Sequence, residues 1–551
     1  MPPLNHFGKT LLTLTISQMI ATPAHTASFL VDSAQDDNGV GCTLREAIVS
    51  VNLANEQDGC VKSGDAFGVS DSIGFDPVEF DQASSHTITL IAAQGGQLSI
   101  APEVSLTING IGEANLTVHG GGENRVLYLH DSTLSVNNLT IAGGDASIGA
   151  GIYAKGASSL SLVNTTVSEN SAELRGGGIA VQDTGYLSLT ESTVSNNYRD
   201  GISLRNGCSA SMRNSNVTDN NGSGIQIRGT NLIDTMQMLP AAHCYVTIEN
   251  TLVTGNSYRG LSSYYGKVDV INSIFSQNLS EGISGLAGSS ISISNSTIAG
   301  NSSTGVSALG RSAQSTGGLY PSVGSGLSMT NSTISGNAGH GISLYQSGVA
   351  LTNSTVTNNI SQSWGGGVSV GRFATLSIKN NIMSGNFAKR GAEVYLGYYA
   401  SIISDNANIV GSNAKPLAEA ILQSPFADGD VIGASDFNAT YDGPSATSIA
   451  SILNPLADNG CQQTAGRTSD AVCIQTHALA VNSLAIDAAN ISYCGAGTDV
   501  IIDQRGETRT EGRCDIGAFE GFVESVNEDP NQGNVETVLP LINGKTLIIS
   551  L

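Results

Sequence analysis

The feature that most constrains the fold is a short unit that recurs along the middle of the chain. Each copy reads Asn-x-x-apolar-x-x-Asn, followed shortly by Gly-apolar-x-apolar, as in Asn331 to Leu344. Successive copies start 22, 23, 27 or 36 residues apart, and this base step with insertions predicts a repeat architecture. The copies run from Asn164, Glu191, Asn214, Asn250, Asn272, Asn295, Asn331, Asn353 and Asn380 to Asn170, Asn197, Asn220, Asn256, Asn278, Asn301, Asn337, Asn359 and Asn386.

Each unit contains three short runs in which apolar and polar residues alternate, such as 327–329, 332–334 and 341–344. Alternation in runs rich in Ile, Val and Thr, bounded by Asn and Gly, indicates strands. Three such strands with their turns use about 22 residues, which is one rung of a β-solenoid. A β-sandwich with unrelated Asn turns is the alternative, and nine copies in register argue against it. We therefore predict an all-β solenoid with three short strands per rung.

The recurring Asn and Gly have expected mechanical roles at the corners of the coil. Asn tolerates a left-handed backbone and bonds neighbouring backbone groups. Stacked Asn side chains can also bond one another in a ladder. The Gly before the third strand is expected to supply a positive φ at a sharp bend.

The N-terminus predicts export. Residues 1–27 have the pattern of a secretory signal, with Lys9, an apolar run over 11–21, and small residues at Ala24 and Ala27. The apolar run is shorter than the roughly 20 residues that cross a bilayer, and we expect no transmembrane span elsewhere. The chain is therefore expected to be secreted, or associated with the cell surface.

The cysteines agree with an oxidising compartment. All eight fall in near-neighbour pairs, and they lack the close spacing of a zinc site. We predict disulfides and leave their connectivity open, with near neighbours pairing as Cys42 and Cys60, Cys208 and Cys244, Cys461 and Cys473, and Cys494 and Cys514.

The net charge of −23 argues against a nucleic-acid partner, because phosphate binding needs clustered Lys and Arg. The chain has no phosphate-binding glycine loop, HExxH motif or Ser-His-Asp ordering in a suitable context. The turn at residues 36–39 lacks the spacing and the terminal Glu of a calcium loop. We expect no cofactor and no metal, with calcium left open, and a monomeric chain.

A different pattern precedes the repeats. Residues 28–32 predict a strand, and the CTLREAI segment from Cys42 predicts a helix, with Thr43 and Glu46 at capping-box spacing. With the segment 72–75, these residues resemble the CSLREA domain, which stands at the N-terminus of secreted bacterial β-helix proteins; Thr43 replaces the family's Ser. A helix-bearing segment here is expected to cover the strand edges of the first rung.

Residues 454–460, 483–488 and 503–520 are similar to the C-terminal choice-of-anchor Q domain, with its DNGG, SPAID and DQRG…DIGAFE signatures. Cys461 and Leu484 depart from the first two signatures. Both resemblances imply a right-handed parallel β-helix of the pectin lyase-like superfamily, without one settled activity. We interpret its charged residues as an ion network that stabilises a cap; they are Arg505, Arg509, Asp515 and Glu520.

The chain is thus expected to have five parts. They are the signal peptide (1–27), a CSLREA-like N-terminal cap (28–76), the β-helix repeats (77–412), a choice-of-anchor Q-like C-terminal capping region (413–521), and an acidic linker with a terminal hairpin (522–551).

Stacking of the rungs converts the repeat into a map of the surface. A strip of mostly small outward residues, from Ser203 to Ser369, runs between two columns that carry Arg, Tyr, His and the only Trp. Aromatic faces cover sugar rings, and guanidinium groups bind carboxylates. We therefore expect the strip to bind an extended carbohydrate through Arg205, Arg228, Arg259, Tyr264, His340, Tyr345, Trp364 and Tyr395.

Three functions are compatible with this map. The first is an adhesin-like interaction protein that binds a polysaccharide or cell-surface glycan without catalysis. The second is a polysaccharide lyase of the pectate lyase type acting on a uronate-containing glycan, for which Arg205, Arg228 or Arg259 would be the base and nearby acids would be required. The third is a purely structural surface protein. The sequence assigns no catalytic residue.

Overall fold

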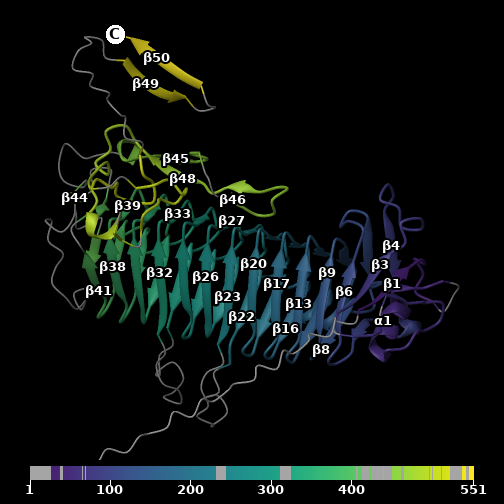
Figure 1. Cartoon of the computed structure of the whole chain (residues 1–551). Coiled ribbons are helices and arrows are strands. Elements are labelled where there is room, and N and C mark those ends of the chain that lie inside the picture. The colour runs from purple at the N-terminus through teal and green to yellow at the C-terminus, as the bar shows by residue number, and fades with distance from the viewer. Residues whose placement is uncertain are drawn as a thin grey trace, which may run out of the picture.

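The predicted coil of strands is confirmed. In the computed structural model, three long sheets, which we call sheets 1, 2 and 3, form the three sides of one elongated body (Figure 1). The strands of each rung pair in parallel with the equivalent strands of the next rung. The structure describes residues 26–37, 41–64, 66–68, 70–230, 243–310, 324–404, 407–411, 421–423, 438–439, 449–460, 464–495, 497–498, 500–509, 512–521, 536–541 and 545–550.

Sheet 1 has 15 strands. In spatial order they are β2 (Ser63–Gly64), β1 (Ala27–Val31), β3 (Asp71–Phe75), β6 (Ser105–Asn109), β9 (Thr133–Asn137), β13 (Ser159–Val163), β17 (Tyr186–Thr190), β20 (Ser209–Arg213), β23 (Cys244–Glu249), β26 (Gly266–Ile271), β29 (Ser290–Ser294), β32 (Ser325–Thr330), β35 (Ser347–Thr352), β38 (Thr375–Lys379) and β41 (Ser401–Ser404).

Sheet 2 has 14 strands. They are β4 (His86–Thr89), β7 (Leu116–His119), β10 (Thr140–Ala142), β14 (Thr166–Ser168), β18 (Thr193–Ser195), β21 (Asn216–Thr218), β24 (Leu252–Thr254), β27 (Ile274–Ser276), β30 (Thr297–Ala299), β33 (Thr333–Ser335), β36 (Thr355–Thr357), β39 (Ile382–Ser384), β42 (Ile409–Val410) and β44 (Asn438–Ala439).

Sheet 3 has 13 strands. They are β5 (Leu98–Ile100), β8 (Leu127–His130), β12 (Ile152–Lys155), β16 (Ile179–Gln182), β19 (Ile202–Arg205), β22 (Ile225–Arg228), β25 (Leu261–Tyr264), β28 (Ile283–Leu286), β31 (Val306–Leu309), β34 (Ile342–Tyr345), β37 (Val368–Val370), β40 (Val394–Leu396) and β43 (Ile421–Gln423). A short pair, β11 (Asp145–Ile148) and β15 (Ser171–Arg175), precedes two of these rungs.

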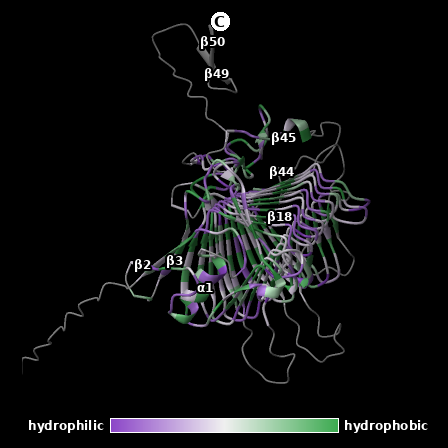
Figure 2. Ribbon diagram, turned by 90° about the vertical axis from the view of Figure 1, so that its right-hand side faces the viewer, coloured by the Kyte–Doolittle hydropathy of each residue, from purple (hydrophilic) through white to green (hydrophobic). Residues whose placement is uncertain are grey.

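Alternating side chains build the interior of the coil. Leu134, Leu160 and Leu187 occupy the same place in successive rungs and are fully buried. Figure 2, which looks nearly along the coil and is coloured by hydropathy, shows hydrophobic stretches of the ribbon recurring from rung to rung. Burial of apolar surface stabilises a fold by about 25 cal/mol per Å², so the stacked columns of buried side chains hold the rungs together.

The predicted asparagine ladder is confirmed at the corner between sheets 2 and 3. The second Asn of every copy is buried, and its Nδ2 donates to Oδ1 of the next copy at 2.8–3.1 Å, from Asn170 to Asn386. Asn386 then donates to the buried carboxylate of Glu393 at 2.6 Å. Because every amide donates in the same direction, a carboxylate that only accepts is a suitable last member.

The first residue of each copy takes the left-handed backbone expected of it, with φ of 46–53° from Asn164 to Asn380. The positive φ expected of the Gly before sheet 3 is present at Gly391, with φ of 59°, but was wrong for most copies. Gly260, Gly282 and Gly305 do not have a positive φ; a Cβ on any of them would lie 2.8–2.9 Å from Nδ2 of the next ladder Asn. Glycine is needed there because the ladder passes too close for a side chain.

The N-terminal segment extends the coil and also covers it. β1 and β3 add two strands to sheet 1, and α1 (Leu44–Leu53) packs beside them with the predicted Thr43–Glu46 capping box. Arg45 binds Asp36 through two nitrogens at 2.7 and 2.8 Å and also donates to backbone carbonyls at residues 96 and 97. These bonds tie the segment to the first rungs.

The C-terminal region lies along the outer face of sheet 2. Figure 1 places β45 (Leu453–Ala457), β46 (Thr464–Ala465) and β48 (Thr476–Leu479) beside the edge formed by β27, β33 and β39. β45 pairs with β48, and β46 pairs with β47 (Val472–Cys473). Two apolar clusters join the region to outward residues of sheet 2; one contains Ile382, Ile409, Ile452 and Ile516, and the other Ile274, Ala465 and Ile474.

The predicted ion network lies inside this C-terminal region. Arg505 and Arg509 are 1% and 2% exposed. Arg505 pairs with Asp503 at 2.7 Å, and Arg509 pairs with Glu520 at 3.1 Å while donating to Oδ1 of Asn331 on the coil. Buried charges that are paired and hydrogen-bonded in this way fit the predicted structural role.

Three predicted disulfides are present, Cys42–Cys60, Cys208–Cys244 and Cys494–Cys514. The fourth predicted pair includes Cys461, which lies outside the described residues, as does nearly all of the expected signal segment. Within the described residues, no helix is long and apolar enough to cross a membrane. β49 (Glu536–Leu541) pairs antiparallel with β50 (Lys545–Ser550).

Candidate functional site

The expected binding residues lie on the outer face of sheet 3 or at the bend before it. Arg205, Arg228 and Tyr264 are register partners at the ends of β19, β22 and β25, and Tyr345 occupies the same column at the end of β34. The serine strip is also in the predicted register, from Ser203 to Ser369.

The strip is not the exposed surface that we expected. Ser203, Ser262, Ser284 and Ser307 are all buried, with exposed fractions of 0–5%. Beside Ser203, two longer side chains are bonded to each other. Arg205 reaches back across the strip, and its Nη2 donates to Oε1 of Gln226 at 3.1 Å. Gln226 is the register partner of Ser203 on the next strand.

The structure divides the predicted residues into two groups. Arg205, Arg228, Arg259 and Tyr264 lie on three successive rungs, β19, β22 and β25. His340, Tyr345, Trp364 and Tyr395 lie farther along, on the rungs of β34, β37 and β40. The rungs of β28 and β31 separate the groups and place Leu286 and Leu309 in the column between Tyr264 and Tyr345.

The first group contains what we call the arginine cluster: Arg175, Arg205 and Arg228. Burial, together with repulsion from Arg175 and Arg228, lowers the pKa of Arg205 to about 10, and the charge of Asp200 partly opposes these effects. Arg205 therefore remains charged at neutral pH. Within the described part of the chain, neither Nε of Arg205 nor Oγ of Ser203 has a hydrogen-bond partner.

One buried carboxyl group lies below this cluster. Asp200 is 9% exposed, and burial raises its pKa, while the hydrogen bond from the Ser223 amide and the charges of Arg205 and Arg199 oppose the rise. Asp183, which follows Gln182 and accepts a hydrogen bond from Asn206, is a second acid beside the cluster. Two carboxylates cannot neutralise three guanidinium groups. The arginine cluster thus retains net positive charge on a chain whose total charge is −23.

Arg259 is already paired. Its Nε and Nη2 donate to the two carboxylate oxygens of Glu281 at 2.9 and 3.2 Å, and its guanidinium lies 4.7 Å from the Tyr258 ring centre. Burial lowers the pKa of Arg259, but the hydrogen bond and charge of Glu281 outweigh burial and leave the pKa raised. Arg259 is therefore a poorer candidate for a base or an anion ligand than Arg205.

The second group is an aromatic cluster, defined as His340, Tyr345, Trp364 and Tyr395. The Trp364 and Tyr395 rings lie 4.8 Å apart, and Trp364 is 47% exposed. Nδ1 of His340 lies 2.7 Å from the carbonyl oxygen of Gly365, and burial lowers the pKa of His340. The exposed rings here are suitable for contact with the apolar faces of sugars.

Tyr395 does not lie in the column to which the sequence assigned it. It pairs in register with Ser369, so it belongs to the serine strip rather than to the column of Tyr345. The prediction counted from Gly391, whereas the residue that occupies the place of Gly367 is Glu393. This shift brings Tyr395 beside Trp364.

Sequence reasoning missed Arg175 and Arg125. Arg175 donates to Oε1 of Gln182, the register partner of Arg205, and Arg125 lies 5.6 and 5.2 Å from the ring centres of Tyr128 and Tyr153. Arg175 precedes the Gly176–Gly178 run at the bend before sheet 3, so the bend map could have included it.

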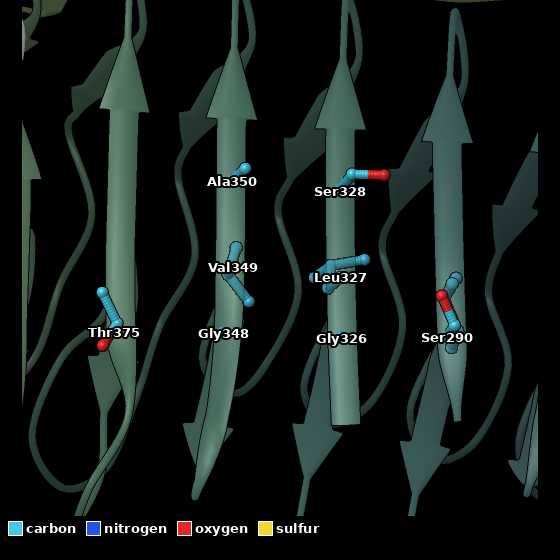
Figure 3. Close-up of a pocket in the computed structure, with 9 residues that line it drawn as sticks. Ser290, Gly326, Leu327, Ser328, Gly348, Val349, Ala350 and Thr375 are labelled. Atoms are coloured by element: carbon cyan, nitrogen blue, oxygen red, sulfur yellow. The ribbon is translucent and has the colours of Figure 1, made fainter. Parts of the chain in front are cut away.

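Sheet 1 carries a shallow hollow of about 400 Å³ on its outer face (Figure 3). Gly326 and Gly348 are stacked between Ser290 and Thr375 in one column, and a Cβ on either glycine would meet nothing within 4 Å. The hollow therefore results from missing side chains. No ionisable residue lines it, so it offers shape but no acid–base chemistry.

No group of three or more His, Cys, Asp or Glu side chains suited to a metal ion occurs in the described ranges. The acids nearest the predicted arginines are single groups, Asp200 beside Arg205 and Glu281 on Arg259.

Comparison with known proteins identifies the coil. The family model described as "Right handed beta helix region" matches residues 107–238 and 240–381. The chain contains a right-handed parallel β-helix. The handedness implied by the sequence resemblance is therefore confirmed. In a separate comparison, no curated protein matches this chain.

Several solved structures are similar at low identity. Pectate lyase Pel9A is 13% identical, with 87% of this chain and 91% of that chain covered and a TM-score of 0.38. The A-module of the Azotobacter vinelandii mannuronan C-5 epimerase AlgE6 is 12% identical (65% and 91% covered, TM-score 0.34). The catalytic domain of a GH87 α-1,3-glucanase is 11% identical (69% and 65% covered, TM-score 0.34). Each activity named here belongs to the similar protein and is not a finding about this chain.

Proposed function

We propose that this chain is an extracellular glycan-binding protein whose binding surface is the outer face of sheet 3. The observation that carries the proposal is that Arg205 is charged and partly buried, and that two further arginines flank it. Its Nε has no hydrogen-bond partner in the described part of the chain. The aromatic cluster adds exposed rings farther along the same face. Guanidinium groups and exposed rings are the side chains that bind acidic groups and sugar faces.

The extracellular assignment has separate support. Three disulfides are typical of an oxidising compartment, and residues 1–27 have the pattern of an export signal. We also propose that residues 28–76 are a CSLREA-like cap and residues 413–521 a choice-of-anchor Q-like region. The chain would then act as an adhesin-like protein, secreted or held at the cell surface.

A polysaccharide lyase is the second candidate. One observation favours it: burial and neighbouring arginines lower the pKa of Arg205 to about 10, which makes it a better base than an ordinary arginine. The lyase hypothesis also requires an acid cluster beside the arginine, and the described residues there supply two separate acids, Asp200 and Asp183, with no group of three. Binding without catalysis therefore fits the surface better.

A glycan array with the purified chain tests the proposal, and absorbance of unsaturated uronate products separates binding from lyase activity. We expect binding without product formation. Trp364→Ala should weaken binding by about tenfold, and Tyr186→Ala, a half-exposed aromatic on sheet 1, should leave it unchanged. If no glycan binds, the chain is a structural protein.

A further inference from the structure

We infer that the arginine cluster, together with Ser203, is a subsite for the acidic group of a glycan, a carboxylate or a sulfate. The inference rests on the proposed glycan binding and adds the chemical class of the ligand. Three observations carry it: two donors without partners, a net positive charge, and a hydrogen bond from Arg205 to Gln226, the register partner of Ser203.

The vacant donors lie two residues apart on one strand. Ser203 and Arg205 both point outward from β19, since Ile202 and Leu204 fill the core. Oγ of Ser203 is buried without a partner, and so is Nε of Arg205. Buried polar groups in folded proteins are almost always paired, so two unpaired donors side by side indicate that something else satisfies them.

The charge selects an anion. Arg175 and Arg228 act on Arg205 from the two neighbouring rungs, and Asp200 alone opposes them in the effects on Arg205. Charge on exposed groups is screened beyond about 8 Å at physiological ionic strength, so the local arginines dominate over the −23 of the whole chain. A neutral hydroxyl ligand would leave this positive charge uncompensated.

The resting position of Arg205 shows how the subsite opens. Its Nη2 bonds the neutral amide oxygen of Gln226 and leaves Nε unused. Carboxylates and sulfates take two parallel bonds from one guanidinium, which a single amide oxygen does not provide. An acidic group that replaces Gln226 would bond both nitrogens of Arg205 and, as Arg205 moves outward, would uncover the hydroxyl of Ser203.

Binding of three polymers to the full chain tests the subsite: polygalacturonate carries carboxylates, dextran sulfate carries sulfates, and dextran is neutral. We expect at least one polyanion to bind. Arg205→Gln should raise its Kd about tenfold to a hundredfold, the value of a charge-assisted hydrogen bond, and Ser203→Ala about threefold. Arg213→Gln on sheet 1, whose arginine is exposed and paired with Glu249, is the matched control and should change nothing.

The polymer that binds identifies the acidic group, because either polyanion alone supports the subsite. Equal polyanion affinity in the wild type, Arg205→Gln and Ser203→Ala would overturn it, provided that thermal unfolding shows all three folded. Binding of dextran alone, lost in Trp364→Ala, would overturn the subsite and leave the proposed glycan binding standing. Binding of none of the three overturns the subsite too, and a blank glycan array then removes the proposed function as well.

Discussion

Sheets 2 and 3 are built from the same repeat, yet their outer faces differ in how their polar groups are paired. On sheet 2, Thr333 donates to Gln504 at 2.6 Å, and Ser335 lies 2.8 Å from Nε2 of His477. On sheet 3, Ser203 has no partner in the described part of the chain. Residues of the C-terminal region bond these two side chains, although Thr357 on sheet 2 also lacks a partner in the described part of the chain. The C-terminal region thus uses the face of sheet 2, whereas the face of sheet 3 is left for the proposed ligand.

The pairing on sheet 2 should be costly to break. Replacing Arg509 with Met removes the positive charge that pairs with the buried Glu520 carboxylate and removes the bond to Asn331. We expect a loss of about 3–5 kcal/mol in the free energy of unfolding of the C-terminal region. Urea unfolding and limited proteolysis measure this loss.

An exposed pair provides the control for Arg509. Arg213 and Glu249 lie 3.0 Å apart on sheet 1, and Arg213 is largely exposed. Arg213→Met should cost no more than about 1 kcal/mol. Equal losses in the two variants would mean that the C-terminal region does not depend on its buried network.

The asparagine ladder lies at the corner between sheets 2 and 3, and breaking it should have the next largest effect on the free energy of unfolding. Asn256→Ala removes the acceptor of Asn220 Nδ2 and the donor to Asn278, leaving buried polar groups unpaired. We expect a loss of about 2–4 kcal/mol in the free energy of unfolding, measured in urea. Asn272→Gly is the control, because its φ of 47° suits glycine, and it should cost less than about 1 kcal/mol. A ladder variant as stable as this control would contradict the proposed role.

Much of the coil was predictable from the sequence, because equivalent residues of successive repeats become neighbours on adjacent rungs. The ladder, the register of the serine strip and the column from Arg205 to Tyr345 all followed from spacing. The placement of Tyr395 failed because one bend carries Glu393 where other copies have Gly.

Two other features could not be predicted from the spacing of the repeats. Residues 449–521 do not repeat, so no periodicity could place them on sheet 2, although apolar outward residues such as Ile274 and Ile382 are a usable sign of a covered face. The burial of Ser203 and the bond between Arg205 and Gln226 depend on side-chain positions, which a one-letter pattern does not contain.

The cover on sheet 2 should also respond to pH. Burial lowers the pKa of His477, and the bond to the Asn454 carbonyl only partly opposes this. The unfolded chain then binds the proton more tightly, so this contribution to stability is present above about pH 6.5 and is lost as the pH falls. Asp515 acts in the opposite sense: burial raises its pKa from 3.8 to about 6, so its contribution is present at low pH and is lost as the pH rises through about 6.

Unfolding of the wild type and of His477→Gln across pH 4–8 separates these contributions. The variant should lose less stability than the wild type as the pH falls below about 6.5, because buried His340 keeps its lowered pKa. Between about pH 4 and 6 the raised pKa of Asp515 should offset part of the remaining loss in both proteins. Parallel curves for the two proteins would rule out His477 as the acid-sensitive group.

The smallest expected effect compares the two faces most directly, because it removes one hydroxyl from each. Ser335→Ala leaves buried His477 without its partner on sheet 2 and should cost about 1 kcal/mol. Ser203→Ala removes a hydroxyl that bonds nothing in the described structure, so without ligand it should be neutral or stabilising by up to about 1 kcal/mol. Thermal unfolding of the two variants in parallel measures the difference. Destabilisation of the same size in both would mean that Ser203 is already satisfied within the fold, and the distinction between a face used by the fold and a face left for a ligand would no longer hold.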